Sequence, residues 1–228
     1  MRIIFKPLAM TVLLAVACTA FGAGGGEMPS RPMGGSSHAP TPQEQAQSSY
    51  NAGVRDVEKA DELAAGAARQ EDAARQAKAL GKAKDKYSSA LKKFAHATDL
   101  DASMYQAWNY VGYTNRKLGD YEAALTAYDR ALRLKPDYAE AIEYRGHAYL
   151  GLNRLGEAKD AYLALFSGNR KLAAQLLAAM QAWVGDHRAN PAGVDGSSLD
   201  AFASWVSERS TIASQTAGLT REGASAAW

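Results

Sequence analysis

The feature that most constrains the fold is an internal repeat, because the sequence matches itself after a shift of 34 residues. Under that shift, small residues fall on small residues and aromatic residues fall on aromatic residues. The matches include Ala107 on Ala141, Gly112 on Gly146, Tyr128 on Tyr162, Tyr87 on Tyr121 and Phe94 on Tyr128. A period of this length indicates a row of supersecondary units, each of which buries its apolar face against the next.

Each unit is predicted to consist of two helices. In the clearest unit, Gly119 can take the left-handed conformation that ends one helix, and Asp120 can cap the next helix. Pro136 prevents the second helix from continuing. Asp137 and Glu140 have the spacing of a capping box for the helix that follows. The unit is therefore predicted to be a helical hairpin with a defined start and end.

Small residues recur at fixed places within these hairpins. We expect Gly112 with Ala124, and Gly146 with Ala158, to let the two helices of a pair approach closely. In the second full unit Asn153 replaces the turn glycine, and asparagine also tolerates left-handed geometry.

These positions carry a family resemblance. The residues Trp108, Tyr110, Gly112, Leu118, Gly119, Tyr121, Ala124, Tyr128, Ala131 and Pro136 resemble the tetratricopeptide repeat. Residues 105–138 match nearly the whole pattern, 139–172 match it with lapses at Arg145, Asn153 and Leu165, and 87–100 match the second helix of an earlier unit. The resemblance implies an all-α, short right-handed α-solenoid of antiparallel helix pairs with about three such units. It also implies that the first helices line a concave face that holds part of another protein.

The segments on either side are less regular. Residues 43–104 are predicted to form an enlarged N-terminal unit of two helices, near 43–66 and 72–98. Residues 173–216 are predicted to form two C-terminal capping helices, because a stack of repeats needs covered ends to stay soluble. Their apolar residues recur at helical spacing: Leu172, Leu176, Met180 and Trp183, then Leu199, Phe202, Trp205 and Ile212. Residues 217–228 are predicted to be a disordered tail.

The beginning of the chain has the order of a secretory signal. In residues 1–23, the basic Arg2 and Lys6 precede an apolar run that is too short to anchor stably in a bilayer, and small residues follow. The segment from Ala15 to Cys18 resembles a bacterial lipoprotein signal, in which Cys18 would be lipidated. The same segment fits an ordinary signal-peptidase site. We favour lipidation and keep the second alternative open.

A flexible linker is predicted to follow this signal peptide. Residues 24–42 are rich in glycine, proline and serine, a composition that cannot bury a core. Together the two segments predict an exported protein of the periplasm, either free or held at the outer membrane through a lipid on Cys18. That lipid is the only membrane contact we expect.

Composition and motifs argue against several classes of protein. The formal charge is +2, and removal of Arg2 and Lys6 with the signal leaves the rest near neutrality, unlike a general nucleic-acid binder. Cys18 is the only cysteine, and the histidines stand apart in sequence, so no metal site is indicated. No nucleophile elbow or phosphate loop is present. We therefore predict a protein that is not an enzyme and needs no cofactor.

Candidate binding residues follow from the family resemblance. Carried onto this sequence, the concave face would include Asn109, Tyr113, Arg116 and Lys117 from one unit and Glu143 and His147 from the next. Residues three and four apart share one side of a helix, so each set can point the same way. The mixed polar composition suits an extended segment of another protein. The identity of that partner and the oligomeric state do not follow from the sequence.

An alternative function rests on a basic stretch. The run from Arg75 to Lys93 holds seven basic residues and the single acid Asp85. Such a helix could bind lipid or an acidic surface in a structural or assembly role. It could equally be a solvated helix face that is balanced by the acidic residues within 56–72.

Overall fold

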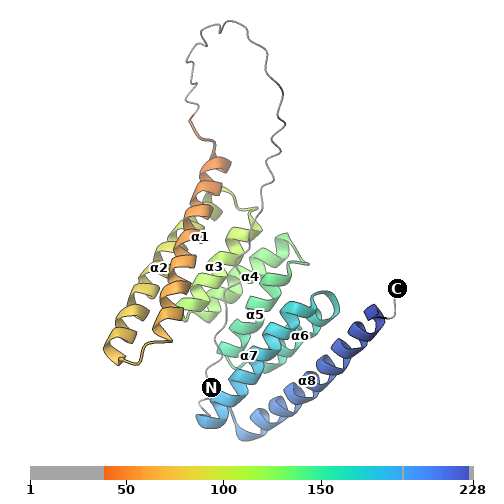
Figure 1. Cartoon of the computed structure of the whole chain (residues 1–228). Coiled ribbons are helices and arrows are strands. Elements are labelled where there is room, and N and C mark those ends of the chain that lie inside the picture. The colour runs from red at the N-terminus through yellow and green to blue at the C-terminus, as the bar shows by residue number, and fades with distance from the viewer. Residues whose placement is uncertain (1–38, 192, 226–228) are drawn as a thin grey trace, which may run out of the picture.

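The computed structural model describes residues 39–191 and 193–225, and side chains as far as residue 216. In these residues the chain forms eight α-helices and no strand (Figure 1). The helices are α1 (Pro42–Ala67), α2 (Ala73–Leu100), α3 (Tyr105–Leu118), α4 (Tyr121–Leu134), α5 (Ala139–Gly151), α6 (Leu155–Gly168), α7 (Arg170–Ala189) and α8 (Gly196–Ser225). The prediction of an all-α solenoid of helix pairs is confirmed. The predicted signal peptide with Cys18, and most of the linker, lie outside the described residues.

The helices pack as successive antiparallel pairs, α1 with α2, α3 with α4, α5 with α6 and α7 with α8. The first helices of consecutive pairs also contact one another, α3 with α5 and α5 with α7. We call the side formed by α1, α3, α5 and α7 the first-helix face. It is the side on which the sequence places the candidate binding residues.

The turns between helices follow the predicted chemistry at two places. Gly119 has φ 90° and Asn153 has φ 57°, so both take the left-handed conformation that ends a helix. The Asp120 carboxylate accepts a hydrogen bond from the Ala123 backbone N–H and caps α4. The predicted capping box of Asp137 and Glu140 is wrong. The N-cap of α5 is Tyr138, one residue later than the box requires, and no side chain caps that helix.

Glycines of α3 and α5 face large side chains of neighbouring helices at close range. A Cβ on Gly112 would lie 2.5 Å from the Tyr128 ring, and one on Gly146 would lie 2.6 Å from Leu176. We expected Ala124 and Ala158 to lie beside these glycines; the nearest side chains are instead Tyr128 of α4 and Leu176 of α7, and Ala161 of the paired helix α6 is 3.3 Å from the Cβ position of Gly146. The glycines instead leave room for a bulky residue that fills the interface.

The N-terminal pair is longer than the regular repeats. Helix α1 has 26 residues and α2 has 28, whereas α3 and α4 have 14 each. The far end of this hairpin, around residues 68–72, therefore extends beyond α3 and α4 (Figure 1). Phe94 is fully buried between α1 and α2, and a Cβ on Gly53 would lie 2.7 Å from its ring. The enlarged unit thus uses the same glycine–aromatic packing as the regular repeats.

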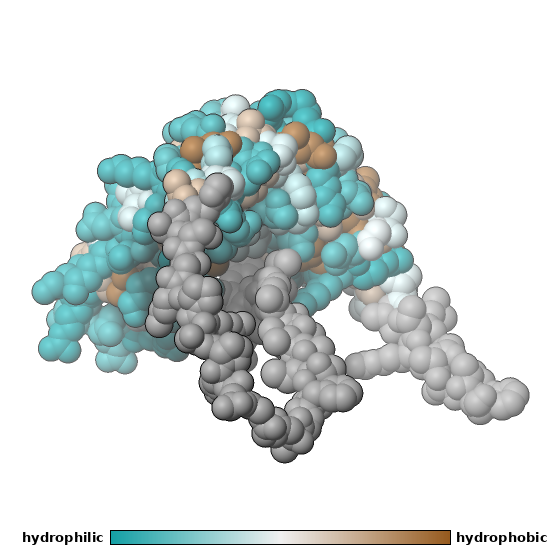
Figure 2. Space-filling model, turned by 90° about the horizontal axis from the view of Figure 1, so that it is seen from above, coloured by the Kyte–Doolittle hydropathy of each residue, from teal (hydrophilic) through white to brown (hydrophobic). Residues whose placement is uncertain are grey.

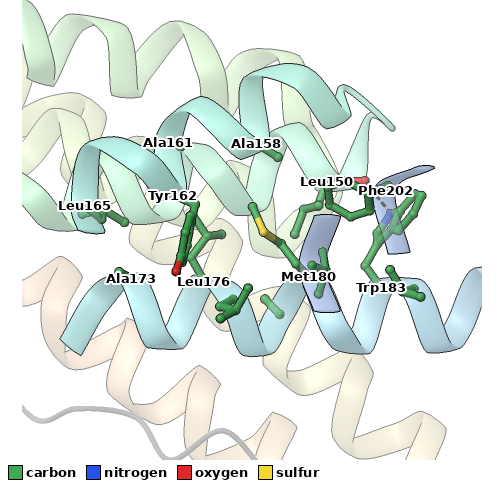
Figure 3. Packing of buried hydrophobic residues seen from close by; sticks show 14 of the residues in the cluster. Leu150, Ala158, Ala161, Tyr162, Leu165, Ala173, Leu176, Met180, Trp183 and Phe202 are labelled. Carbon is green, nitrogen blue, oxygen red and sulfur yellow. Dashed lines mark hydrogen bonds between the residues drawn. The ribbon is translucent and has the colours of Figure 1, made fainter. Parts of the chain in front are cut away.

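The largest hydrophobic cluster lies at the C-terminal end, where α5, α6, α7 and α8 meet (Figure 3). Leu165, Leu176, Met180 and Phe202 are at most 1% exposed there. The Trp183 indole N–H donates to the Leu150 carbonyl at 2.9 Å and joins α7 to the end of α5. Helix α8 continues to Ser225, whereas we predicted a disordered tail from residue 217. No proline interrupts this stretch, and good helix formers (Ala217, Leu219, Arg221 and Glu222) stand in it beside Gly218 and Gly223.

Candidate functional site

The candidate binding residues come together across α3 and α5. Tyr113, Arg116 and Lys117 lie on α3, and Glu143 and His147 lie one turn apart on α5. The rings of Tyr113 and Tyr144, from the two helices, have centroids 5.2 Å apart, so the two sets share one side of the molecule. Most of these side chains are engaged with one another or with α1, and they form a connected polar network.

Asp61 on α1 is the centre of this network, and sequence reasoning missed it. Its carboxylate accepts hydrogen bonds from the hydroxyls of Tyr113, at 2.7 Å, and of Tyr87. Lys117 lies 3.4 Å from the same carboxylate. The 34-residue repeat does not extend to α1 in register, so it could not reveal Asp61. The one sequence signal for Asp61 is that an acidic residue stands among apolar residues at helical spacing.

Lys117 is held between aromatic rings as well as by Asp61. Its ammonium lies 5.6 Å from the Tyr87 ring centroid and 5.4 Å from that of Tyr113. Burial lowers the pKa of Lys117, and nearby Arg116 lowers it further, while Asp61 opposes the change. Lys117 therefore stabilises the joint between α1, α2 and α3.

Arg116 occupies the space between α3 and α5. Its guanidinium lies 5.2 Å from the Tyr113 ring centroid and 5.4 Å from that of Tyr144. Burial would lower the pKa of Arg116, but the neighbouring Tyr128, Tyr113 and Glu143 raise it above the ordinary value. Arg116 thus remains a cation in a largely enclosed position, and its Nε is buried without a hydrogen-bond partner.

Glu143 and His147 form a pair within α5. The His147 Nε2 lies 2.8 Å from a carboxylate oxygen of Glu143, and Glu143 is only 5% exposed. Burial lowers the pKa of His147, and Arg116 adds to this effect, although the hydrogen bond to Glu143 opposes it. The neutral imidazole is therefore favoured in the folded protein.

Asn109 was predicted to line the concave face, but its side chain is buried. It is 2% exposed, and its Oδ1 is buried without a hydrogen-bond partner. The repeat pattern places Asn109 on the same side of α3 as Tyr113, but it gives no measure of depth. The structure places Asn109 in the interior, so it can contact a partner only if the surrounding side chains move.

The first-helix face also presents a group of tyrosines that sequence reasoning did not select. The rings of Tyr50 and Tyr110 have centroids 5.7 Å apart, and those of Tyr105 and Tyr138 are 4.9 Å apart. These four side chains are partly exposed, and their hydroxyls make no hydrogen bond within the described residues. Burial raises the pKa of Tyr50 and of Tyr138. The hydroxyls thus stay protonated and can donate to a partner.

Two depressions lie elsewhere on the surface, away from the candidate residues. One of about 510 Å³ lies between α4, α5 and α6, where Leu132, Ile142, Arg145 and Tyr149 contribute to its walls. The other, of about 470 Å³, lies against α1 and α2 at Leu63, Lys82 and Lys86. Neither is lined by any of the six predicted binding residues.

The basic run of α2 is partly neutralised within the N-terminal pair. Asp56 of α1 accepts hydrogen bonds from Lys86 at 3.2 Å, Lys93 at 2.5 Å and the Ser89 hydroxyl at 2.6 Å. Burial would raise the pKa of Asp56, but these bonds outweigh it and lower the pKa to about 2. Two of the seven cations in this run therefore pair with Asp56, which is one of the acidic residues that the interpretation of a balanced helix face named.

Two further properties bear on what the described residues can do. None of the helices in residues 39–225 combines the length and apolar composition that crossing a bilayer requires. In the same part of the chain, no group of three histidine, cysteine, aspartate or glutamate residues could hold a metal ion.

The fold and this face define an α-helical repeat protein. The family model described as TPR repeat matches residues 112–153, which supports the predicted tetratricopeptide repeats in this stretch. The uncharacterized protein ycf37 of Guillardia theta is 30% identical over 84 residues, which make up 35% of this chain and 47% of that protein. The chain thus spans about half the length of this curated relative.

One of the solved structures that this chain matches is a repeat domain. The second TPR domain of the human RPAP3 protein, in complex with the HSP70 peptide SGPTIEEVD, is 22% identical to this chain. The superposition covers 60% of this chain and 95% of that domain, with a TM-score of 0.45.

Proposed function

We propose that the protein is a non-enzymatic scaffold of the bacterial envelope, which binds an extended segment of another protein on its first-helix face. The observation that carries this proposal is the group of partly exposed tyrosines whose hydroxyls make no hydrogen bond within the described residues, contributed by α1, α3 and the start of α5. Tyrosine offers a large apolar surface and a hydrogen-bond donor at low entropic cost, which suits recognition of polypeptide.

The mostly hydrophilic surface favours a polar rather than an apolar partner segment. On the face seen in Figure 2, hydrophilic residues cover most of the coloured surface, and hydrophobic residues form small separate areas. The large hydrophobic residues that are exposed, Leu80, Leu134 and Leu163, lie on three different helices. A contact dominated by one broad apolar patch is therefore not favoured.

Site-specific crosslinking in cells tests the proposal. A photoreactive phenylalanine analogue would replace Tyr105 on α3, where an aromatic ring keeps the contact with Tyr138. The matched control places the same analogue at the exposed Thr126 on α4. We expect a specific envelope protein to be captured from Tyr105 and not from Thr126. Equal capture from both positions, or none from Tyr105, would reject the first-helix face as the binding surface.

The location in the cell is part of the same proposal. The signal-like residues 1–23 support export to the periplasm, and Cys18 supports attachment of lipid there. Metabolic labelling with a fatty-acid analogue, compared between the parent chain and Cys18→Ser, distinguishes the two alternatives. Label that is lost in Cys18→Ser indicates a lipoprotein, and an unlabelled, soluble periplasmic chain indicates ordinary cleavage. Recovery in the cytoplasm would contradict export.

A further inference from the structure

A line of aromatic rings joins α6 to the C-terminal helix α8. The rings of Tyr162 and Trp205 meet edge to face with centroids 5.5 Å apart, and Phe166 lies 5.5 Å from Tyr162. Phe202 is stacked with Trp205 at 6.4 Å. We call this joint, with the side chains that border it, the α6–α8 seam. Its aromatic residues come from segments about 40 positions apart in the sequence, so no local motif reveals it.

Three cations lie over these rings. The Lys159 ammonium is 5.5 Å from the ring centroids of both Phe202 and Trp205. The Arg209 guanidinium is 5.4 Å from that of Trp205. Arg170, at the start of α7, has its guanidinium 3.5 Å from the ring centroid of Phe166. The rings attract and position these cations through their electron-rich faces.

Within the described residues, these cations have no acidic partner, unlike two arginines on the neighbouring α5 and before α6. Arg145 and Arg154 pair with Asp129 and Glu157 at 2.8 Å, whereas Lys159, Arg170 and Arg209 form no ion pair with any side chain that the structure describes. The Arg209 Nε is buried without a hydrogen-bond partner. Arg170 donates a long hydrogen bond of 3.4 Å to the Thr216 hydroxyl. The seam thus holds positive charge with unused donors.

The surroundings of Tyr162 agree with this excess of positive charge. Burial raises the pKa of Tyr162, while Arg209 and Arg170 both act to lower it. The ring contacts agree, since Arg209 of α8 and Arg170 of α7 lie over Trp205 and Phe166, the two rings beside Tyr162. An anionic group placed beside them would meet two fixed cations and further donors.

We propose that the α6–α8 seam binds an acidic, extended segment of a partner protein. Lys159 and the Phe166 ring under Arg170 are seven residues apart on α6, which is about 10 Å along the helix axis. An extended peptide covers that distance in about three residues. Two acidic side chains within about four residues of each other can therefore reach both ends of the seam. Carboxylates match the planar fork of an arginine guanidinium.

The partial burial of two of the seam cations favours a peptide over a flat anionic surface as the occupant. Lys159 and Arg209 are partly buried, and the exposed Arg170 rests against the Phe166 ring, whereas a lipid headgroup layer favours long basic side chains that project freely. The seam lies on different helices from the tyrosines of the first-helix face, so this proposal does not depend on the function proposed above. The Tyr105 crosslinking experiment can therefore fail while this one succeeds.

Calorimetric titration of the full chain tests the proposal. The probe is a capped octapeptide of alternating glutamate and alanine, and the control peptide has glutamine in place of glutamate. We expect binding of the acidic peptide that weakens with added salt, and none of the control peptide. Arg209→Gln and Arg170→Gln should each weaken binding on the order of tenfold. Arg188→Gln, which removes an exposed charge at the other end of α7, should leave binding unchanged.

The controls separate loss of binding from loss of folding. Circular dichroism of each variant establishes that it is folded, and Arg209→Lys should retain part of the affinity because it keeps the charge. If Arg209→Gln does not fold, Arg170→Gln decides the question, since Arg170 is exposed. Equal affinity of Arg170→Gln and the parent chain would overturn the proposal. So would binding of anionic vesicles through these arginines without binding of the acidic peptide.

Discussion

Gly112 sets the spacing between α3 and α4, because the fully buried Tyr128 ring occupies the space where a Cβ would lie. We expect Gly112→Ala to lower the free energy of unfolding by about 1–3 kcal/mol, the usual cost of overpacking a filled core. Urea denaturation measures this change. Gly156→Ala is the matched control, because nothing lies within 4 Å of its added Cβ, and it should be neutral or slightly stabilising. Equal effects of the two substitutions would contradict the packing described.

His147 makes the stability of the protein depend on pH. Its pKa in the folded state is below the ordinary value of 6.5 because the ring is buried, so the unfolded chain binds the proton more strongly. Its contribution to stability is therefore fully present above pH 6.5 and is lost as the pH falls toward the folded-state pKa.

Unfolding measured from pH 7.5 to 5.5 tests this expectation. The free energy of unfolding should decrease as the pH falls in the parent chain. It should decrease equally in His96→Gln, because His96 is exposed. The decline should be smaller in His147→Gln. An unchanged pH dependence in His147→Gln would show that other groups cause it.

At the scale of the elements, Asp61 joins α1 to the regular repeats. Its side chain is 15% exposed and accepts from Tyr87 and Tyr113, with Lys117 close by. We expect Asp61→Asn to destabilise the protein by about 1–3 kcal/mol, because it leaves the Lys117 charge without a partner. Hydrogen exchange should accelerate first in α1. Glu62→Gln, which breaks only an exposed pair with Lys59, should change the stability by less than about 0.5 kcal/mol.

The sequence predicted the elements better than their contacts. The hairpin turn at Gly119 and Asp120 could be predicted, since left-handed geometry and helix capping depend on neighbouring residues alone. The start of α5 was misplaced by one residue, because an uncapped start leaves no strong local signal. The partner of Gly112 was also missed, since a small residue shows that something approaches closely without showing what.

At the scale of the whole molecule, α8 covers the end of the stack. Its Phe202 and Val206 are at most 3% exposed within the largest hydrophobic cluster. Removing residues 196–228 should expose this cluster, lower the melting temperature and cause self-association, which light scattering detects. Removing only 217–228 should leave the protein monodisperse, because it retains these contacts. Self-association of both truncated chains to the same extent would argue against a capping role of α8.

The helices that hold the candidate residues could be predicted, but the contacts and burial of these residues could not. The repeat correctly placed Tyr113, Lys117 and His147 on one side of the molecule. It could not show that Asp61 engages Tyr113 and Lys117, because the enlarged N-terminal unit departs from the repeat register. Nor could it show the burial of Asn109, since depth depends on neighbours from other helices. The tyrosines and the seam likewise depend on contacts between distant segments.

The central claim is that a partner segment lies on the first-helix face, and hydrogen–deuterium exchange with the crosslinked partner, once purified, tests it most directly. We expect slower exchange on complex formation in α3 and α5, with the strongest effect in residues 105–117. Exchange in α4, which lies on the other side of its pair, should not change. Protection confined to α2 or α4, with α3 and α5 unaffected, would contradict the claim.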